Sequence, residues 1–268
     1  MKTLLSELNQ YMTSARALHC ICLAAGLAFS AWTFPDILPD IFRAAVAQEP
    51  IKSKQGAKLR KPSMADTIRA NIYADNWFML YINGELAVVD SIQFIPHNVI
   101  SVDLLPTYPM TLAVMARDNA DPKTGMEYAN TNIGDGGFII KFADGTVTDA
   151  SWKAKSFSTG PIGADTKNPR VENTPVPENW FAVDFDDNTW PNAKEYSEDE
   201  VKPKQPYYDN DFQGAKFIWS NDVKLDNLVL FRKKVISPPD GKERIDFSNL
   251  NNIVPEQPPR GDRRGPPR

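Results

Sequence analysis

NWFMLYINGELA, residues Asn76 to Ala87, is the stretch that decides the fold. From Trp77 to Ile82 it carries apolar groups on both faces, which is typical of a covered β-strand. Asn83-Gly84 follows at once and is a strong hairpin signal, because a type I′ turn needs positive φ at both central residues. We therefore expect an antiparallel hairpin in which Glu85 to Asp90 pairs back on the first strand.

The flanking sequence repeats this pattern of short apolar segments separated by turn residues. Strands are expected at residues 68–73, 100–104, 111–115, 138–142, 148–152 and 227–235. No segment has a long 3.6-residue apolar period, so Glu178 to Asn188 and Ser197 to Val201 hold at most short helical turns. Many short strands without helical crossovers predict a sandwich or barrel of antiparallel strands.

Composition and charge narrow the class of protein. With 42% hydrophobic residues, the 268-residue chain has ample material for a core, and an all-β domain of this size is ordinary. The net charge of -4 and the scattered basic residues give no overall attraction to polyphosphate. We therefore expect no nucleic-acid partner.

The N-terminus resembles a secretory signal. Lys2 and Arg16 precede an apolar run from Ala17 to Phe34, and the small-residue site Ala45-Val46-Ala47 stands just before Gln48. The alternative is an uncleaved membrane anchor, because about 18 apolar residues can just span a bilayer. Both alternatives place residues 48 onward outside the cytoplasm, secreted or in the cell envelope, with membrane contact only through this segment if it is uncleaved.

Four regions follow from these patterns. Residues 1–47 form the signal peptide or membrane anchor, and residues 48–64 form a basic linker with few large apolar groups. Residues 65–236 form the β-sandwich. Residues 237–268 form a tail rich in proline and arginine, which is predicted to be disordered because it cannot bury a core.

Few residues are suited to nucleophilic or zinc chemistry. Cys20, Cys22 and His19 all lie in the N-terminal segment, so His97 is the only histidine in the rest of the chain. A cysteine-based zinc site is excluded there, and no GxSxG nucleophile elbow occurs. We interpret His97 as a loop or strand-end residue and expect no catalytic residue.

The order of several motifs resembles the galactose-binding-like jelly-roll modules, such as the accessory sugar-binding domains of α-L-rhamnosidases and β-galactosidase-type glycoside hydrolases. The motifs are LYINGE, ADGTVTDASWKA followed by Gly160-Pro161, DFDDNTWPNA, FIW and a final FRKKV, and the likeness spans about Asp66 to Val235. The resemblance implies an all-β antiparallel jelly-roll sandwich. Trp152 and Trp190 are then expected in the core, and Asp186-Asp187 is expected to bond backbone amides.

The resemblance also implies a function. In those hydrolases the catalytic carboxylates belong to a separate barrel, and no segment of domain size follows Val235. We therefore expect an exported noncatalytic carbohydrate-binding module whose partner is a glycan or cell-surface polysaccharide. The alternative is a structural or protein-interaction module that binds another envelope protein or belongs to an extracellular assembly; a small glycan-active enzyme is the third hypothesis.

Two loops are the candidate sugar sites, because a sugar offers C–H groups to an aromatic face and hydroxyls to carboxylates and amides. The candidates are Asp75, Asn76 and Trp77, together with Tyr207, Tyr208, Asp209, Asn210 and Asp211. The alternative for the first is a turn beside a core tryptophan, and for the second an ordinary polar loop.

The segment RDNADPKTGME offers hard oxygen ligands for calcium. These are Asp118, Asn119, Asp121 and Glu127. Their spacing does not fit an EF-hand, and an Asp-Pro with a nearby glycine is also typical of a long surface turn. A structural calcium ion is therefore the only cofactor considered, and an ordinary loop is the alternative.

Overall fold

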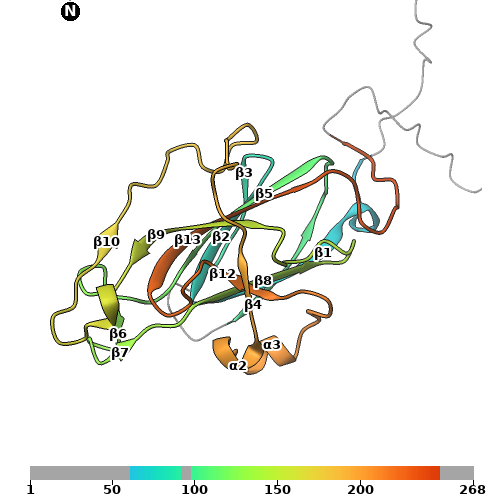
Figure 1. Ribbon diagram of the computed structural model, residues 1–268. Coiled ribbons are helices and arrows are strands. Elements are labelled where there is room, and N and C mark those ends of the chain that lie inside the picture. The colour runs from blue at the N-terminus through green and yellow to red at the C-terminus, as the bar shows by residue number, and fades with distance from the viewer. Residues whose placement is uncertain (1–60, 92–97, 248–268) are drawn as a thin grey trace, which may run out of the picture. The chain divides into compact units, whose positions relative to one another are not determined.

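The computed structural model describes residues 61–91 and 98–247 (Figure 1). Contacts divide the chain into two units, residues 1–56 and 57–268, and every described residue belongs to the second. The expected N-terminal segment 1–47 and His97 lie outside the described residues. Within the described part, no helix is long and apolar enough to cross a membrane.

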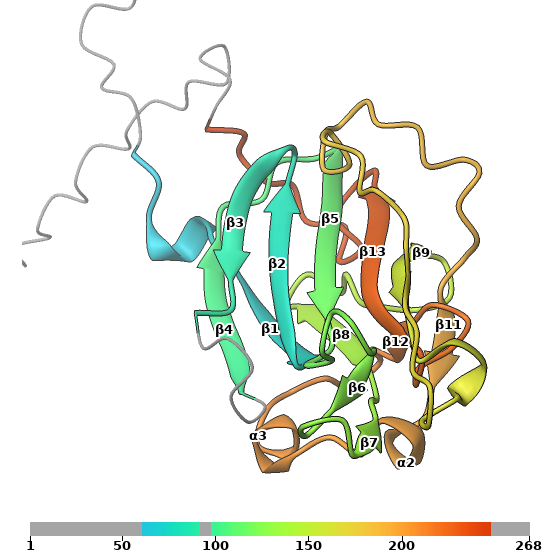
Figure 2. The ribbon, with the colours of Figure 1, turned by 90° about the vertical axis from the view of Figure 1, so that its left-hand side faces the viewer.

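Two antiparallel sheets pack face to face and confirm the predicted all-β sandwich (Figures 1 and 2). One sheet has the order β11 (Lys194–Tyr196), β12 (Phe217–Trp219), β8 (Gly137–Phe142), β1 (Ile68–Asp75) and β4 (Val99–Leu104). The other has the order β10 (Glu172–Asn173), β9 (Lys153–Thr159), β13 (Asp226–Val235), β5 (Met110–Arg117), β2 (Trp77–Ile82) and β3 (Glu85–Val89). The smaller elements are a two-stranded ribbon, β6 (Met126–Glu127) and β7 (Asn132–Ile133), and the short helices η2 (Met64–Asp66), η3 (Ile162–Ala164), α2 (Glu198–Val201) and α3 (Gln205–Tyr208).

The main core lies between the sheets and is rich in aromatic rings. Phe138 on one sheet stacks on Phe231 of the other, with ring centroids 5.5 Å apart, and Trp152 meets Phe138 edge-on at 6.4 Å. All three rings are fully buried, which removes a large apolar area from water. The expectation that Trp152 is a core residue is confirmed.

A second apolar cluster covers the outer face of the six-stranded sheet. Trp180 and Trp190, from the long segment 174–193, pack on Leu230 of β13. Because Leu230 alternates with core-facing neighbours on its strand, it points away from the main core. Trp190 is therefore buried as expected, but under this covering segment rather than between the sheets.

Buried Arg232 fastens the covering segment to the sheet. Its Nε donates to Asp187 Oδ2 at 2.9 Å, its second terminal nitrogen donates to the carbonyl of Ala182 at 2.9 Å, and its first donates to the carbonyl of Trp180. Asp186 accepts from the backbone N–H of Asn188 at 3.0 Å, as expected. The side chain of Asp187 differs from the expectation, because it pairs with Arg232.

The local predictions are confirmed at the first hairpin and wrong at one strand. β2 and β3 pair through Asn83 and Gly84, whose φ angles are 50° and 85°. The strand expected at residues 148–152 is a turn instead, because Asp149 Oδ1 accepts from the backbone N–H of Ser151 at 2.8 Å. The strand begins only at Lys153. Helix α3 was not expected from the sequence.

Candidate functional site

Loops from distant parts of the chain meet at one end of the sandwich. Figure 2 shows the turn between β1 and β2, the ribbon β6–β7 and the helices α2 and α3 at this end. Asn76 Oδ1, in the β1–β2 turn, accepts from the backbone N–H of Asn119 after β5 at 2.7 Å. Tyr73 Oη accepts from the backbone N–H of Lys204 at 3.1 Å, which links β1 to the helical segment.

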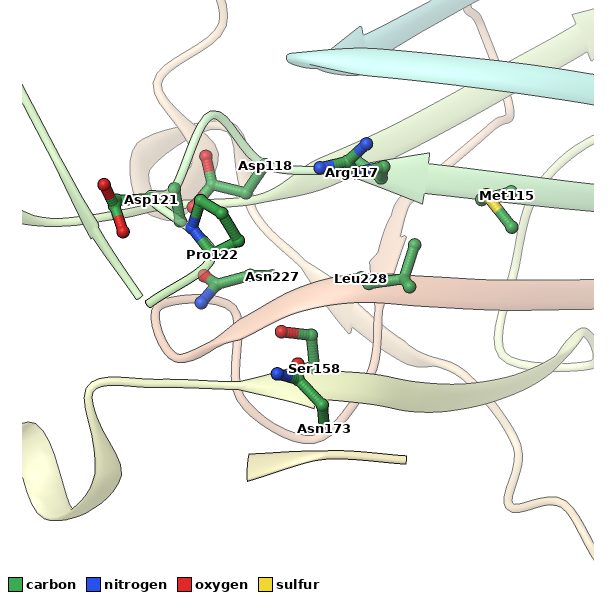
Figure 3. Close-up of a pocket in the computed structure, with 10 residues that line it drawn as sticks. Met115, Arg117, Asp118, Asp121, Pro122, Ser158, Asn173, Asn227 and Leu228 are labelled. Atoms are coloured by element: carbon green, nitrogen blue, oxygen red, sulfur yellow. The ribbon is translucent and has the colours of Figure 1, made fainter. Parts of the chain in front are cut away.

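A pocket of about 220 Å³ opens at this end, beside the final residues of β5 (Figure 3). Neighbouring strands β5, β13 and β9 contribute to its wall, together with β10 and the loop after β5. The lining residues are Met115, Arg117, Asp118, Ala120, Asp121, Pro122, Ser158, Asn173, Asn227 and Leu228.

The pocket combines apolar groups with hydrogen-bonding groups of both kinds. Met115 and Leu228 are half-buried apolar side chains, and Leu228 is the strand partner of Arg117. Arg117 supplies cationic donors, and the side chain of Asn173 is an exposed amide at the rim. The pocket can therefore hold a small ligand that has an apolar face and polar edges.

Three buried carboxyl groups lie at this end of the sandwich, and one of them, Asp118, lines the pocket. Asp118, Glu127 and Asp75 are 2%, 5% and 2% exposed. Burial, followed by the charge of Glu127 and a hydrogen bond with it, raises the pKa of Asp118 well above its ordinary value. The side chain of Asp118 therefore joins the ribbon strand β6 to the end of β5.

Asn227 lies directly beside Asp118 across the strands. The backbone N–H of Asp118 donates to the carbonyl of Asn227 at 3.0 Å, and Asn227 Nδ2 donates to the carbonyl of Gly160 at 3.0 Å. Among the described residues, Asn227 Oδ1 is one of two buried side-chain atoms without a hydrogen-bond partner in the protein. A buried acceptor of this kind is costly unless water or a ligand satisfies it.

The three residues of the first candidate sugar site have different positions. Asp75 and Asn76 are buried, and Asn76 Nδ2 donates to Asp75 Oδ1 at 2.8 Å. Trp77 is half-buried on the outer face of the six-stranded sheet, because the next residue, Phe78, points into the core. Its strand partner is Arg117, a residue of the pocket wall. Trp77 alone therefore presents a surface next to the pocket.

The second candidate sugar site forms α3 and the residues after it. Tyr207 stacks on Phe212 with ring centroids 5.1 Å apart, and its Oη donates to Glu198 at 2.8 Å. Asp209 accepts from Gln205, Asn210 donates to the carbonyl of Pro206, and Asp211 pairs with Lys141. Tyr208 is 56% exposed. The polar groups of this loop thus bond within the loop, to α2 or to β8, and Tyr208 presents the accessible ring.

The candidate calcium ligands divide into two groups. Asp118 and Glu127 come together, with Asn119 following directly, whereas Asp121 is exposed and accepts from the backbone N–H groups of Lys123 and Thr124 at 2.7 and 3.2 Å. In the part of the chain that the structure describes, no group of three His, Cys, Asp or Glu side chains is arranged to hold a metal ion. Calcium at this loop stays a prediction.

Most of the pocket wall was not predicted from the sequence. Met115, Arg117, Asn173, Asn227 and Leu228 carry no motif of their own. The available signal is that Arg117 lies two residues past the strand expected at 111–115 and that Asn227 begins the strand expected at 227–235. Which strand ends become neighbours depends on sheet order and register, and neither follows from one sequence.

Comparison with protein-family models, with curated proteins and with solved structures found no match. The resemblance to galactose-binding-like modules therefore stays a prediction, and the class defined by the structure is an all-β antiparallel sandwich with a pocket at one end.

Proposed function

We propose that this chain is an exported, noncatalytic carbohydrate-binding module. The pocket beside the end of β5 is the observation that carries the proposal. Its walls place the apolar side chains of Met115 and Leu228 beside hydroxyl, amide, carboxyl and guanidinium groups. A sugar ring has the complementary character, since C–H groups form its faces and hydroxyls that both donate and accept surround its edge.

The size of the pocket favours a single sugar unit within it. Its volume of about 220 Å³ lies below the roughly 300–1,000 Å³ of sites for drug-sized ligands. Because the pocket opens at the end of the sheet, the rest of a glycan would extend outside it. This geometry supports recognition of one unit of a larger glycan or cell-surface polysaccharide.

A small glycan-active enzyme receives less support from the carboxyl groups of the site. Glycoside hydrolysis uses two carboxyl groups about 5 to 9.5 Å apart, on either side of the bond to be cleaved. Asp118 and Glu127 instead hydrogen-bond to each other. Enzyme activity would require turnover of a glycan that is lost in Glu127→Gln while the protein remains folded.

A protein-interaction module is the second candidate, and one edge strand favours it. β3 is the last strand of its sheet, and its residues Leu86 and Val89 are 53% and 39% exposed. An open strand edge can pair with a segment of another chain. A stable envelope partner recovered with wild-type protein and lost on Val89→Lys, without any glycan affinity, would support this alternative.

The experiment that tests sugar binding is a glycan array probed with the full chain in mild detergent. Ala120→Trp is the test variant, because Ala120 is a half-buried residue of the pocket wall and a larger ring fills the space. Ala150→Trp is the matched control, since Ala150 is exposed in the turn before β9, at the opposite end of that strand from Ser158. We expect glycan binding in wild type and control and its loss in Ala120→Trp.

Two results would contradict the proposal. One is absence of binding to every glycan by a protein with a cooperative thermal unfolding transition. The other is equal glycan binding by wild type and folded Ala120→Trp, which would move the sugar site elsewhere. Tyr208→Ala on the same array then tests the exposed ring of the second candidate site.

Export is a separate part of the proposal and rests on the sequence of residues 1–47. Fractionation of cells that produce the full chain should recover it outside the cytoplasm. N-terminal sequencing should begin at Gln48 if the segment is cleaved, whereas an intact N-terminus in the membrane fraction would mean that it is an anchor.

A further inference from the structure

The pocket continues onto the outer face of the six-stranded sheet through paired residues. Arg117 of the pocket wall is the strand partner of Trp77, and Met115 is the strand partner of Met79. Directly opposed side chains on one face of a sheet have Cβ atoms about 4.5–5.5 Å apart. Trp77 and Met79 therefore lie immediately beside the pocket wall.

Trp77 and Met79 form an apolar platform beside the pocket, and Met79 also packs against the second apolar cluster. Both side chains are half-buried, and each alternates with a core residue of β2, so they point outward. Farther along the same face, Tyr81 is stacked under Phe181 at 4.4 Å. The second apolar cluster thus covers the face from Met79 onward, and Trp77, at the start of β2, stays next to the pocket.

The tryptophan ring is held in position. Trp77 Nε1 donates to the carbonyl of Asp90 at 2.8 Å, and this bond ties the ring to the residue after β3. A fixed aromatic face loses little conformational entropy when a ligand packs on it. Trp77 is therefore suited to stack on the C–H face of a ring.

The charges of the pocket are close to balance. Arg117 provides one positive charge and Asp121 one negative charge at the wall, while Asp118 is buried and bonded to Glu127. A site of this kind gives no net attraction for a strongly charged chain. It matches a neutral ligand that offers hydroxyl groups.

We propose that the ligand is a neutral oligosaccharide of at least two sugar units, with one unit in the pocket and the next packed on Trp77 and Met79. This inference rests on the proposed function and adds to it a second subsite and the class of glycan. A ligand bound only by a terminal sugar would use the pocket alone. An acidic polysaccharide would meet no surplus of positive charge, because Arg117 shares the pocket wall with Asp118 and Asp121.

The test is isothermal titration calorimetry with two neutral series and one acidic series. The probes are galactose, galactobiose and galactotetraose; glucose, cellobiose and cellotetraose; and galacturonic acid with its dimer and tetramer. In wild type, affinity should rise about tenfold from mono- to disaccharide in at least one neutral series, equivalent to about 1.4 kcal/mol. The acidic series should bind more weakly.

Trp77→Ala should lose this gain, with the disaccharide about tenfold weaker and the monosaccharide within about twofold of wild type. Trp77→Phe retains a ring and should restore most of the gain, which separates stacking from a general folding defect. Met79→Ala is a second platform variant with no hydrogen bond to lose. Ile236→Ala is the matched control and should not change either affinity, because Ile236 is 66% exposed and follows the end of β13 opposite Asn227.

The outcomes separate the two proposals. Absence of binding to all three series and to the glycan array would overturn the proposed function together with this inference. Binding that is independent of chain length, or equally weakened for mono- and disaccharide by Trp77→Ala, would overturn the second subsite while sugar binding stands. Tighter binding of the acidic series would overturn the neutral class.

Discussion

Gly134 packs directly against the carboxyl group of Asp118. A Cβ at position 134 would lie 2.0 Å from Oδ2 of Asp118, which is far inside van der Waals contact. Asp118 cannot easily move away, because it is 2% exposed, hydrogen-bonded to Glu127 and fixed through its backbone to Asn227. This close contact joins the loop after β7 to Asp118, a lining residue of the pocket at the end of β5.

The first prediction concerns this contact. Gly134→Ala should lower the free energy of unfolding by about 1–3 kcal/mol through overpacking. In an Asp118→Ala background the same change should cost less than about 1 kcal/mol, because the crowded oxygen is gone. Urea unfolding of the four proteins measures the coupling, and equal costs of Gly134→Ala in both backgrounds would contradict it.

The second prediction is a pH dependence at Asp118. Since burial and Glu127 raise its pKa in the folded state, its contribution to stability is fully present below the unfolded pKa, near 4, and is lost as the pH rises through the folded value. Asp118→Asn should therefore gain stability relative to wild type between pH 5 and pH 8. Urea unfolding in EDTA measures this. Ala150→Asn, an exposed change that removes no titratable group, is the control, and its difference from wild type should not change with pH.

The third prediction concerns calcium. Asp121 makes bonds within its own turn, and Asp118 bonds to Glu127, so the four candidate ligands are not assembled around one point. We expect the same melting temperature in millimolar calcium and in EDTA. A calcium-dependent rise that disappears in Glu127→Gln would instead establish the calcium site that the sequence suggests.

The fourth prediction concerns the hydrogen bonds between Arg232 and the covering segment, residues 174–193. Arg232→Met should cost about 3 kcal/mol of stability, because it removes the donor to Asp187 and to the carbonyl of Trp180 and one of the two donors to the carbonyl of Ala182. Limited proteolysis should then cut within residues 174–193. Lys234→Met, an exposed change on the same strand, should stay within about 0.5 kcal/mol of wild type. Unchanged resistance to protease in a destabilised Arg232→Met would argue against a role in fastening the segment.

The fifth prediction separates two adjacent tyrosines. Tyr207→Ala should cost about 2 kcal/mol, because its ring packs on Phe212 and Phe217 and its hydroxyl bonds Glu198. Tyr208→Ala should change the melting temperature little, since the ring is 56% exposed. Thermal unfolding measures both. The reverse order of effects would mean that the loop packs differently from the described arrangement.

The sequence predicts what is encoded locally. The Asn83-Gly84 hairpin requires only two residues with positive φ, and both have it. The wrong prediction of a strand at residues 148–152 also has a local cause. The apolar pattern favours a strand, but the side chain of Asp149 accepts from the backbone N–H of Ser151 and stabilises a turn. At these residues the hydrogen bond of Asp149 outweighs the preference of the sequence for a β-strand.

The pocket depends on information that one sequence does not contain. Asp118 and Asn227 are 109 positions apart, and their adjacency follows from the pairing of β5 with β13. The sequence suggests Asp118 as a calcium ligand and Trp77 as a sugar-binding residue in two separate loops. Only the order of the strands shows that Trp77 lies beside Arg117, in the wall of the same pocket that Asp118 lines. Long-range register of this kind requires the whole set of strands.

The assembly of the pocket from β5, β9, β10 and β13 has a thermodynamic consequence. Its wall exists only when strands from residues 115 to 228 are paired, so a ligand bound there has no counterpart site in the unfolded chain. Ligand binding must then raise the free energy of unfolding with the logarithm of ligand concentration, by about 2.7 kcal/mol at 100 times the dissociation constant, and the unfolding temperature rises with it. A thermal-shift screen of glycans can therefore identify the ligand, because only a bound glycan raises the unfolding temperature of the sandwich.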